Sequence, residues 1–434
     1  MKIRFLARPL AALLTASLGA ASAWSAPALP ADVQGLVDDV MPQVIEWRRD
    51  IHAHPELGNR EFRTSALVAE HLERLGMEVQ TKVGVTGVVG VLRGGREGPV
   101  VALRADMDGL PVTEVVDLPF ASKVRTDYNG EEVGVMHACG HDNHVAILMG
   151  VAEVLAAIRD DIPGTVKFIF QPAEEGPPAG EEGGAGLMVR EGALEDPDVE
   201  AIFGLHVFPT PVGTLAWKSG GMMASADSFS ITVNGRQTHG AMPWAGIDPI
   251  VVASQIVLGL QTIPSRQLDA TLTPSIVTVG AIHGGVRSNI IPEQVEMIGT
   301  IRTFDAETRL QIHERVKRTA MSIAESAGAT AEVDVQLGTP VTSNDPELTR
   351  RMLPTLERVA GAGLVESPRV TGAEDFSEFQ AAVPGMFFFL GVAPDDPALV
   401  APNHSPRFYA DERALPMGVT AMTALALDYL QGRE

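Results

Sequence analysis

The chain has 434 residues, of which 45% are hydrophobic and 20% charged, with 43 glycines and 30 prolines. This composition is typical of a globular protein of about two to three domains and excludes a disordered, collagen-like or coiled-coil chain. Lysine and arginine number 33 against 55 aspartates and glutamates, a net charge of −22, which disfavours binding to nucleic acid or to an anionic membrane surface.

The first residues predict a secretory signal peptide. A basic start is followed by an apolar run from Leu10 to Ala20, and Ala21-Ser22-Ala23 offers the small side chains of a cleavage site. We therefore expect residues 1–23 to be removed and the mature protein to be secreted, with the periplasm as its compartment. The apolar run is too short to span a bilayer, and no later run of about 18 uncharged apolar residues follows. No membrane span is expected.

The chain contains a single cysteine, Cys139. Exported proteins usually form disulfides, but this thiol has no partner within the chain. It is either a buried bystander or a group with a specific use, and we favour a metal ligand.

The first half of the mature chain predicts alternating helices and strands. The strands are uniformly apolar, which is typical of a mostly parallel sheet covered by helices on both faces, with the active groups beyond the carboxyl ends of the strands. The expected helices cover residues 42–54, 63–75 and 145–158, and the expected strands cover 88–92, 100–103, 166–170 and 201–207.

Near residue 218 the pattern changes to strands with alternating polar and apolar residues, at 229–233, 276–279 and 295–301. Helices between them, one capped by Asp248 and one over 306–324, complete an α+β unit. A buried-looking strand at 386–391 then resumes the first pattern. We therefore predict an α/β protein whose catalytic domain, with a mostly parallel central sheet flanked by helices, spans 24–217 and 335–434 and is interrupted by an inserted α+β lid and dimerisation domain at 218–334.

The strongest local signal is the motif HACGHDNH, directly before the expected apolar helix. In it Cys139 and His141 flank Gly140, and this spacing lets a thiolate and an imidazole converge on one ion. The neighbouring His137 and His144 fit capping or supporting roles better than ligand roles.

A second signal is the acidic pair in the motif QPAEEG, after a hydrophobic strand. Adjacent side chains point in different directions, so one of Glu174 and Glu175 can bind metal while the other serves as general base toward the attacking water. An acidic pair in a loop is often only a solvated surface, but its place beyond a buried strand favours function.

Single residues complete the candidate site. With His206 and His404, the residues Cys139, His141 and Glu175 give five N, S or O ligands, more than one tetrahedral zinc needs, and such a set suits two ions. Asp108 follows an expected strand, and we assign it an orienting role at the catalytic site. A further acidic pair, Glu374-Asp375, is either a helix cap or part of the site.

The ordered motifs across nearly all of the mature chain resemble a known family, the dinuclear metallopeptidases related to aminoacylase. Within it they look like the branch of hippurate hydrolases and amidohydrolases of indole-acetyl-amino acids. The motifs are WRRDIHAHPELG, ALRADMDGLPV, HACGHDNH, QPAEEG, GLHVFP, THGAMPWAGIDPI, SNIIPE, GAEDF and NHSPRF.

The resemblance carries roles onto matching positions. It implies the metal ligands Cys139, His141, Glu175, His206 and His404 and the general base Glu174. It also implies a homodimer formed through the lid domain, in which His239 reaches a neighbouring active site, and a substrate carboxylate held by Asn289 and Arg302. The chain departs from the family pattern at Ala373 and at Arg287-Ser288, which bears on the shape of the acyl or carboxylate pocket.

These observations predict a metal-dependent amidohydrolase that cleaves N-acyl-amino acids or the terminal bond of a small peptide, as a carboxypeptidase or dipeptidase does. Its cofactors would be two divalent ions per subunit, zinc or manganese, with nickel as a third candidate. Two rival hypotheses are a cysteine hydrolase with Cys139 as nucleophile and a two-domain solute-binding protein. Sensitivity to a chelator tests the first rival, and turnover of any acyl-amino acid tests the second.

Overall fold

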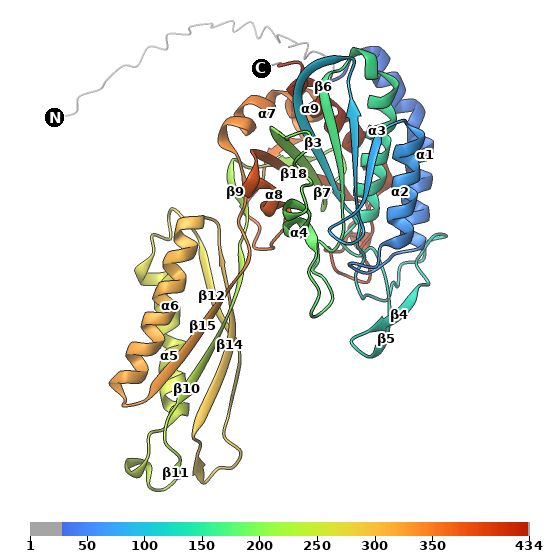
Figure 1. The fold of residues 1–434 in the computed structure, drawn as a ribbon. Helices are drawn as coiled ribbons and strands as arrows, with labels where there is room; N and C mark the ends of the chain where they lie inside the picture. The colour runs from blue at the N-terminus through green and yellow to red at the C-terminus, as the bar shows by residue number, and fades with distance from the viewer. Residues whose placement is uncertain (1–27, 433–434) are drawn as a thin grey trace, which may run out of the picture.

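Two separate β-sheets organise the chain, one in a large α/β part and one in a smaller part that projects from it (Figure 1). The structure is a computed structural model and describes residues 28–432. The predicted signal peptide, residues 1–23, lies outside the described residues. Within 28–432, no helix is both long and apolar enough to cross a bilayer.

The large part contains an eight-stranded sheet in the order β1-β2-β6-β3-β7-β18-β8-β17. Its centre, from β6 to β18, is parallel, whereas β1, β2 and the contact between β18 and β8 are antiparallel. The predicted mostly parallel sheet is confirmed. The strands are β1 (Glu78–Val83), β2 (Gly87–Arg93), β3 (Arg96–Asp106), β6 (Pro163–Gln171), β7 (Ala201–Pro211), β8 (Leu215–Trp217), β17 (Leu364–Glu366) and β18 (Gly385–Ala393).

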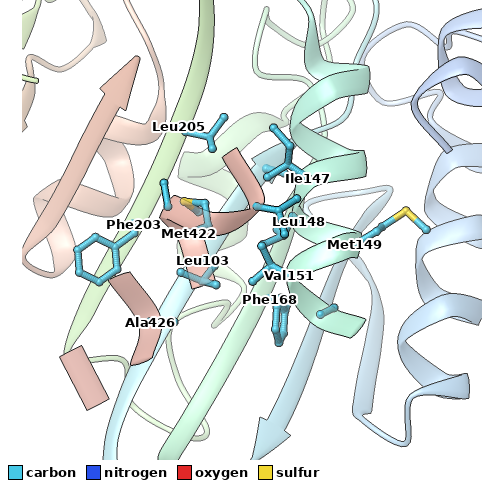
Figure 2. Close-up of a cluster of buried hydrophobic side chains, with 14 of the residues drawn as sticks. Leu103, Ile147, Leu148, Met149, Val151, Phe168, Phe203, Leu205, Met422 and Ala426 are labelled. Carbon is cyan, nitrogen blue, oxygen red and sulfur yellow. The ribbon is translucent and has the colours of Figure 1, made fainter. Parts of the chain in front are cut away.

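Helices cover both faces of this sheet. The main core lies under α3, which is apolar on nearly every side because it is enclosed by the sheet and by other helices. In Figure 2, Ile147 and Leu148 of α3 lie beside Leu103 of β3 and Met422 of α9. Burying each such side chain contributes about 1.5–3 kcal/mol. The helices are α1 (Ala31–Ala53), α2 (Phe62–Arg74), α3 (His141–Ala157), α4 (Gly184–Arg190), α7 (Pro346–Ala360), α8 (Phe376–Ala382) and α9 (Leu415–Leu430).

The smaller part, which we call the lid, has a four-stranded antiparallel sheet in the order β12-β14-β10-β15. Residues Phe229, Ile231 and Val233 alternate inward and pack under two helices. Among the described residues, both helices of this part lie on that one face of the sheet (Figure 1). The Asp248 carboxylate caps the first helix as predicted. The elements are β10 (Ala226–Asn234), β12 (Ser275–Gly284), β14 (Gln294–Thr303), β15 (Thr330–Thr339), α5 (Pro249–Thr262) and α6 (Ala306–Ser326).

Short elements complete the two parts. A two-stranded hairpin projects below the large sheet, and another pair lies at the end of the lid away from that sheet (Figure 1). The short strands are β4 (Arg125–Tyr128), β5 (Glu131–Gly134), β9 (Gly220–Met223), β11 (Thr238–His239), β13 (Ile290–Ile291) and β16 (Thr342–Asn344). Short helical turns are η1 (Arg159–Asp161), η2 (Pro243–Ala245), η3 (Ile263–Gln267), η4 (Gly361–Gly363), η5 (Pro397–Leu399) and η6 (Glu412–Ala414).

Two expected helix boundaries were wrong. Helix α1 begins at Ala31 and not at Pro42, which lies inside it. The buried residues Val33, Val37 and Met41 continue the apolar face of the helix through the proline, and tertiary packing outweighs the local boundary signal. Helix α3 begins at His141, so the second half of the HACGHDNH motif forms its first turn.

Candidate metal centre

The candidate ligands converge where several strands of the large sheet end. Asp108 follows β3, Glu174 and Glu175 follow β6, and His206 lies within β7. Cys139 directly precedes α3, and His404 lies in the loop after β18. Parallel strands bring their carboxyl ends to one edge of a sheet, so residues far apart in sequence meet there.

Cys139 lies between two imidazoles. Its Sγ atom is 3.3 Å from His206 Nε2 and 3.3 Å from His404 Nε2. The Nδ1 atom of His206 donates to the Val207 carbonyl at 2.7 Å, which leaves the Nε2 lone pair facing the thiol. The His404 backbone N–H donates to the Ala138 carbonyl at 2.8 Å and thereby ties the two loops together.

His141 presents a free nitrogen to the same cluster. Its Nδ1 atom bonds to Asp108 Oδ1 at 3.1 Å, while its buried Nε2 has no hydrogen-bond partner among the described residues. Gly140 makes this turn possible: its φ is +97°, and a Cβ atom there would lie 2.3 Å from Val207 Cγ2.

The two glutamates of the acidic pair face different partners. Glu175 Oε1 is 2.8 Å from His404 Nε2, and its backbone N–H donates to Asp108 Oδ2 at 3.0 Å. Asp108 therefore holds His141 and Glu175 at once, which fits its predicted orienting role. Glu174 lies between two groups: one of its carboxylate oxygens is 3.8 Å from His141 Nε2, and it also lies within 4.8 Å of carboxylate oxygens of Glu374 and Asp375.

Buried charges surround Glu174. The Arg104 guanidinium donates to Asp106 at 2.5 Å, to Glu374 at 3.0 Å and to Asp375 at 3.2 Å. Burial and the neighbouring Glu374 carboxylate raise the pKa of Glu174 well above its ordinary value. The pair Glu374-Asp375 is thus part of this site's surroundings and not simply a helix cap.

The loop before the acidic pair is held by a residue that we did not anticipate, Glu61. Its Oε1 accepts from the Ala173 N–H at 2.9 Å and its Oε2 accepts from Thr86 Oγ1 at 2.5 Å. Ala173 has a φ of +51°, which is rare for a residue with a side chain, and the bond from Glu61 stabilises this turn. A sequence signal for Glu61 is lacking because its partners are distant along the chain.

The other two histidines of the motif have no ligand position. His144 Nδ1 bonds to Asp106 at 2.5 Å and its Nε2 accepts from the Val207 N–H at 2.8 Å, so both nitrogens are used. His137 is buried and neither of its nitrogens has a partner among the described residues, but it belongs to none of the groups of donors that converge within 4.8 Å.

The assembled donors fit divalent metal ions. Each of Cys139, His141 and His206 offers a donor atom, and the three atoms lie within 4.8 Å of one another. The same holds for the donors of Cys139, Glu175 and His404. Thiolate, imidazole and carboxylate are the ligands of zinc and related ions, and the two groups share the thiol, as expected for a pair of ions. The buried Nε2 atom of His141, which has no hydrogen-bond partner among the described residues, also supports binding of a metal ion here.

The geometry disfavours the hypothesis of a cysteine hydrolase. Burial and the carboxylates of Glu175 and Glu174 raise the pKa of Cys139 well above its ordinary value. Catalytic thiols have a lowered pKa and partial exposure instead.

The lid residues lie apart from this cluster and from one another. His239 pairs with Ile290 in the β11–β13 ribbon, beside Asn289, at the far end of the lid (Figure 1). Arg302 lies at the other end of β14, where Ile301 pairs with Asp227. The eight residue-to-residue steps from 294 to 302 span roughly 25 Å. One lid therefore cannot bring Asn289 and Arg302 to the same carboxylate.

Known proteins have similar sequences and a similar fold. Residues 102–428 match the profile of Peptidase family M20/M25/M40. The chain is 42% identical over 396 residues to Thermostable carboxypeptidase 2 of Saccharolobus solfataricus, covering 91% of this chain and 97% of the relative. It is 40% identical over 400 residues to IAA-amino acid hydrolase ILR1-like 2 of Arabidopsis thaliana, covering 90% and 87%.

A solved structure agrees with these matches. The Bacillus subtilis YXEP protein, described as a dinuclear metal binding peptidase, superposes with a TM-score of 0.76 at 36% identity. The match covers 91% of this chain and 99% of that one.

Proposed function

Because the chain belongs to peptidase family M20/M25/M40 and is a metal-dependent hydrolase of amide bonds, we propose that it cleaves the amide between an acyl group and an amino acid, or the terminal bond of a small peptide. The observation that carries this proposal is the meeting of Cys139, His141, Glu175 and His404 donors beside the carboxyl of Glu174.

Each residue of the cluster has a distinct task. Cys139, His141, Glu175, His206 and His404 hold two divalent ions, and Asp108 orients two of these ligands. Such ions polarise the amide carbonyl and make water nucleophilic at neutral pH. Glu174 accepts a proton from the attacking water and returns it to the leaving amine. The ligand set suits zinc or manganese, with nickel as a third candidate.

The active form is a homodimer joined through the lid. Strand β12 is an edge strand with exposed Ile276 and Ile282, and the adjacent α5 exposes Leu258 and Val251. An open edge beside an apolar helix is a surface that soluble proteins usually cover. A two-fold axis would pair the two β12 edges and continue the sheet.

Such a dimer accounts for the distance between Asn289 and Arg302 within one lid. The partner subunit's His239 and the partner subunit's Asn289 would reach the site from the far end of their lid, while Arg302 acts within its own chain. His239 would then donate to the carbonyl oxygen as negative charge develops in the transition state. His239 is exposed and its Nδ1 accepts from the Ala241 N–H at 3.0 Å, which leaves Nε2 as the donor.

The protein acts outside the cytosol, in the periplasm, after removal of residues 1–23. The basic, apolar and small-residue regions of the N-terminus support this proposal. Mass spectrometry of the protein from its native cell should find a mature chain that begins near Trp24, and intact Met1 in the cytosol would contradict export.

A hydrolysis screen tests the function. The enzyme, stripped by a chelator and then reloaded with zinc, manganese or nickel, is offered N-acetyl-, benzoyl- and indole-acetyl-amino acids beside dipeptides. Activity should disappear with the chelator and return with at least one metal. Turnover that survives complete metal removal, or no turnover of any amide with any metal, would overturn the proposal.

A further inference from the structure

A cavity of about 390 Å³ opens beside the metal cluster. Glu175 and Asp108 line it, and so do residues 125–129, which are strand β4 and the first residue of the turn that follows it. The remaining walls are the loops at 55–60, 109–111 and 176–178. Because Glu175 is a metal ligand in the proposed function, a group attached to the reacting carbonyl can extend directly into this space.

The hairpin is fixed firmly enough to shape a pocket. Asn129 and Gly130 have φ angles of 56° and 84°, the backbone of a tight two-residue turn. At its base the Val135 N–H donates to the Val124 carbonyl at 3.0 Å, and Leu110 and Met136 exchange two backbone hydrogen bonds of 2.9 and 3.0 Å. The hairpin is thus continuous with the loop that carries Asp108.

The lining is apolar where it is not acidic. Both arginines on the wall are already paired, Arg60 with Glu181 at 2.5 Å and Arg125 with Glu132 at 2.5 Å. Asp127 also lines the cavity, as do Asp108 and Glu175. Glu56 lines it too, but its carboxylate accepts from the Arg63 and Thr64 N–H groups at 2.8 Å each. An anionic group would therefore be repelled here. Apolar contacts come from the half-exposed Tyr128 ring and from Leu57, Leu110, Pro111, Val124 and Pro177.

We propose that this cavity, hereafter the hairpin pocket, is the subsite for the acyl side of the substrate, that it selects an uncharged apolar acyl group, and that Tyr128 sets the preference for a large one. The inference rests on the proposed function and adds its substrate class. The substrate carboxylate then lies on the opposite side of the metal centre, toward the lid, because both arginines that line the hairpin pocket are already paired with glutamates.

The test measures kcat/KM for a series with one amino acid and varied acyl groups. We expect benzoyl to exceed acetyl in the wild-type enzyme, and Tyr128→Ala to lower the benzoyl-to-acetyl ratio about tenfold, the scale of a lost apolar contact. Tyr128→Phe should keep the ratio because it keeps the ring. Glu131→Ala is the matched control, since Glu131 pairs with Tyr128 across the hairpin but does not line the cavity.

The charge of the acyl group provides a second, independent test of the hairpin pocket. An anionic succinyl group should react more slowly than an uncharged acyl group of the same length, and Asp127→Asn should narrow this difference severalfold. The amide oxygen of asparagine can still accept the Gly130 N–H that Asp127 accepts at 3.2 Å, so the turn is retained.

Each outcome has a distinct meaning. If Tyr128→Ala slows benzoyl and acetyl substrates equally, the hairpin pocket is not the acyl subsite, although amide hydrolysis stands. If a dipeptide with a free amine outperforms its acylated form and Asp127→Asn slows it, the pocket binds an ammonium group and the inference is wrong. If the wild-type enzyme hydrolyses none of the series with any metal, the proposed function itself fails.

Discussion

The adjacent residues Glu174 and Glu175 should respond differently to the same substitution. Glu175→Gln removes a carboxylate that faces His404, so it should lower the metal content. Glu174→Gln should retain both ions and bind substrate while kcat falls by about 10²–10⁴, the usual contribution of a general base. Metal analysis of the purified variants beside steady-state kinetics checks this. Equal metal loss in both variants would show that the division of roles is wrong.

At the scale of residues, chemistry was predictable where a local motif concentrates it. The sequence around Cys139 and His141 indicated convergence because two donors flank a glycine, and the structure brings their donor atoms together. Glu61 and Arg104 escaped notice because each is an isolated charged residue whose partners lie far away in the chain. A single buried charge leaves no periodic signal in a sequence.

At the scale of elements, His71 of α2 should make the packing of the first helices sensitive to acid. Its Nε2–H donates to the Met149 carbonyl of α3 at 3.1 Å, and its ring lies 4.7 Å from that of Trp47 in α1. Burial lowers the pKa of His71 from 6.5 to about 4. In the unfolded chain His71 therefore binds a proton below about pH 6.5, whereas in the folded chain it stays neutral until about pH 4.

The contribution of neutral His71 to stability is fully present above the pKa of this residue in the unfolded chain. It is lost as the pH falls toward the pKa of His71 in the folded chain. Between about pH 7 and about pH 5, this group alone should cost about 2 kcal/mol of unfolding free energy. His71→Gln keeps a donor for the Met149 carbonyl but does not titrate, so it should lose correspondingly less. Urea titrations at both pH values, with a chelator present to remove metal linkage, measure the difference. An equal loss in both proteins would contradict the assignment.

Helices and strands were predictable from the sequence where their buried residues recur at a regular spacing or fill the whole element. The alternating residues of β10 and the apolar residues of α3 identified their elements because one face or every face is buried. The hairpin of β4 and β5 was missed because its strands are short, charged and exposed. The dipeptide Asn129-Gly130 was the available signal, since it favours a tight hairpin turn.

At the scale of the whole molecule, a mixed dimer tests whether sites are shared. Protomers with Glu174→Gln and protomers with His239→Ala should each be inactive as homodimers. In a heterodimer, one site combines an intact Glu174 with the partner subunit's His239. Random exchange should restore about a quarter of wild-type activity, because half of the dimers are mixed and one of their two sites works.

The matched control mixes Glu174→Gln with Glu175→Gln. Both residues lie in the large part of the chain, so no heterodimer contains a complete site and no activity should return. If verified heterodimers with His239→Ala remain inactive, His239 does not act across the interface. The family resemblance implied this arrangement, but the sequence did not show that Arg302 and Asn289 lie far apart in one lid, because that follows from the length and pairing of β14.

The position of β18 has a consequence for the order in which the protein can form. Strand β18 fills the space between β7 and β8 in the large sheet, and His404 follows it. In a chain synthesised from its amino end, Cys139 precedes by 265 residues His404, whose Nε2 lies 3.3 Å from the thiol. Contacts between distant residues, such as that between Arg48 and Glu412, which are 364 residues apart, form last. If synthesis stops before residue 385, the large sheet lacks the strand between β7 and β8, and the Cys139 thiol lacks its contact with His404.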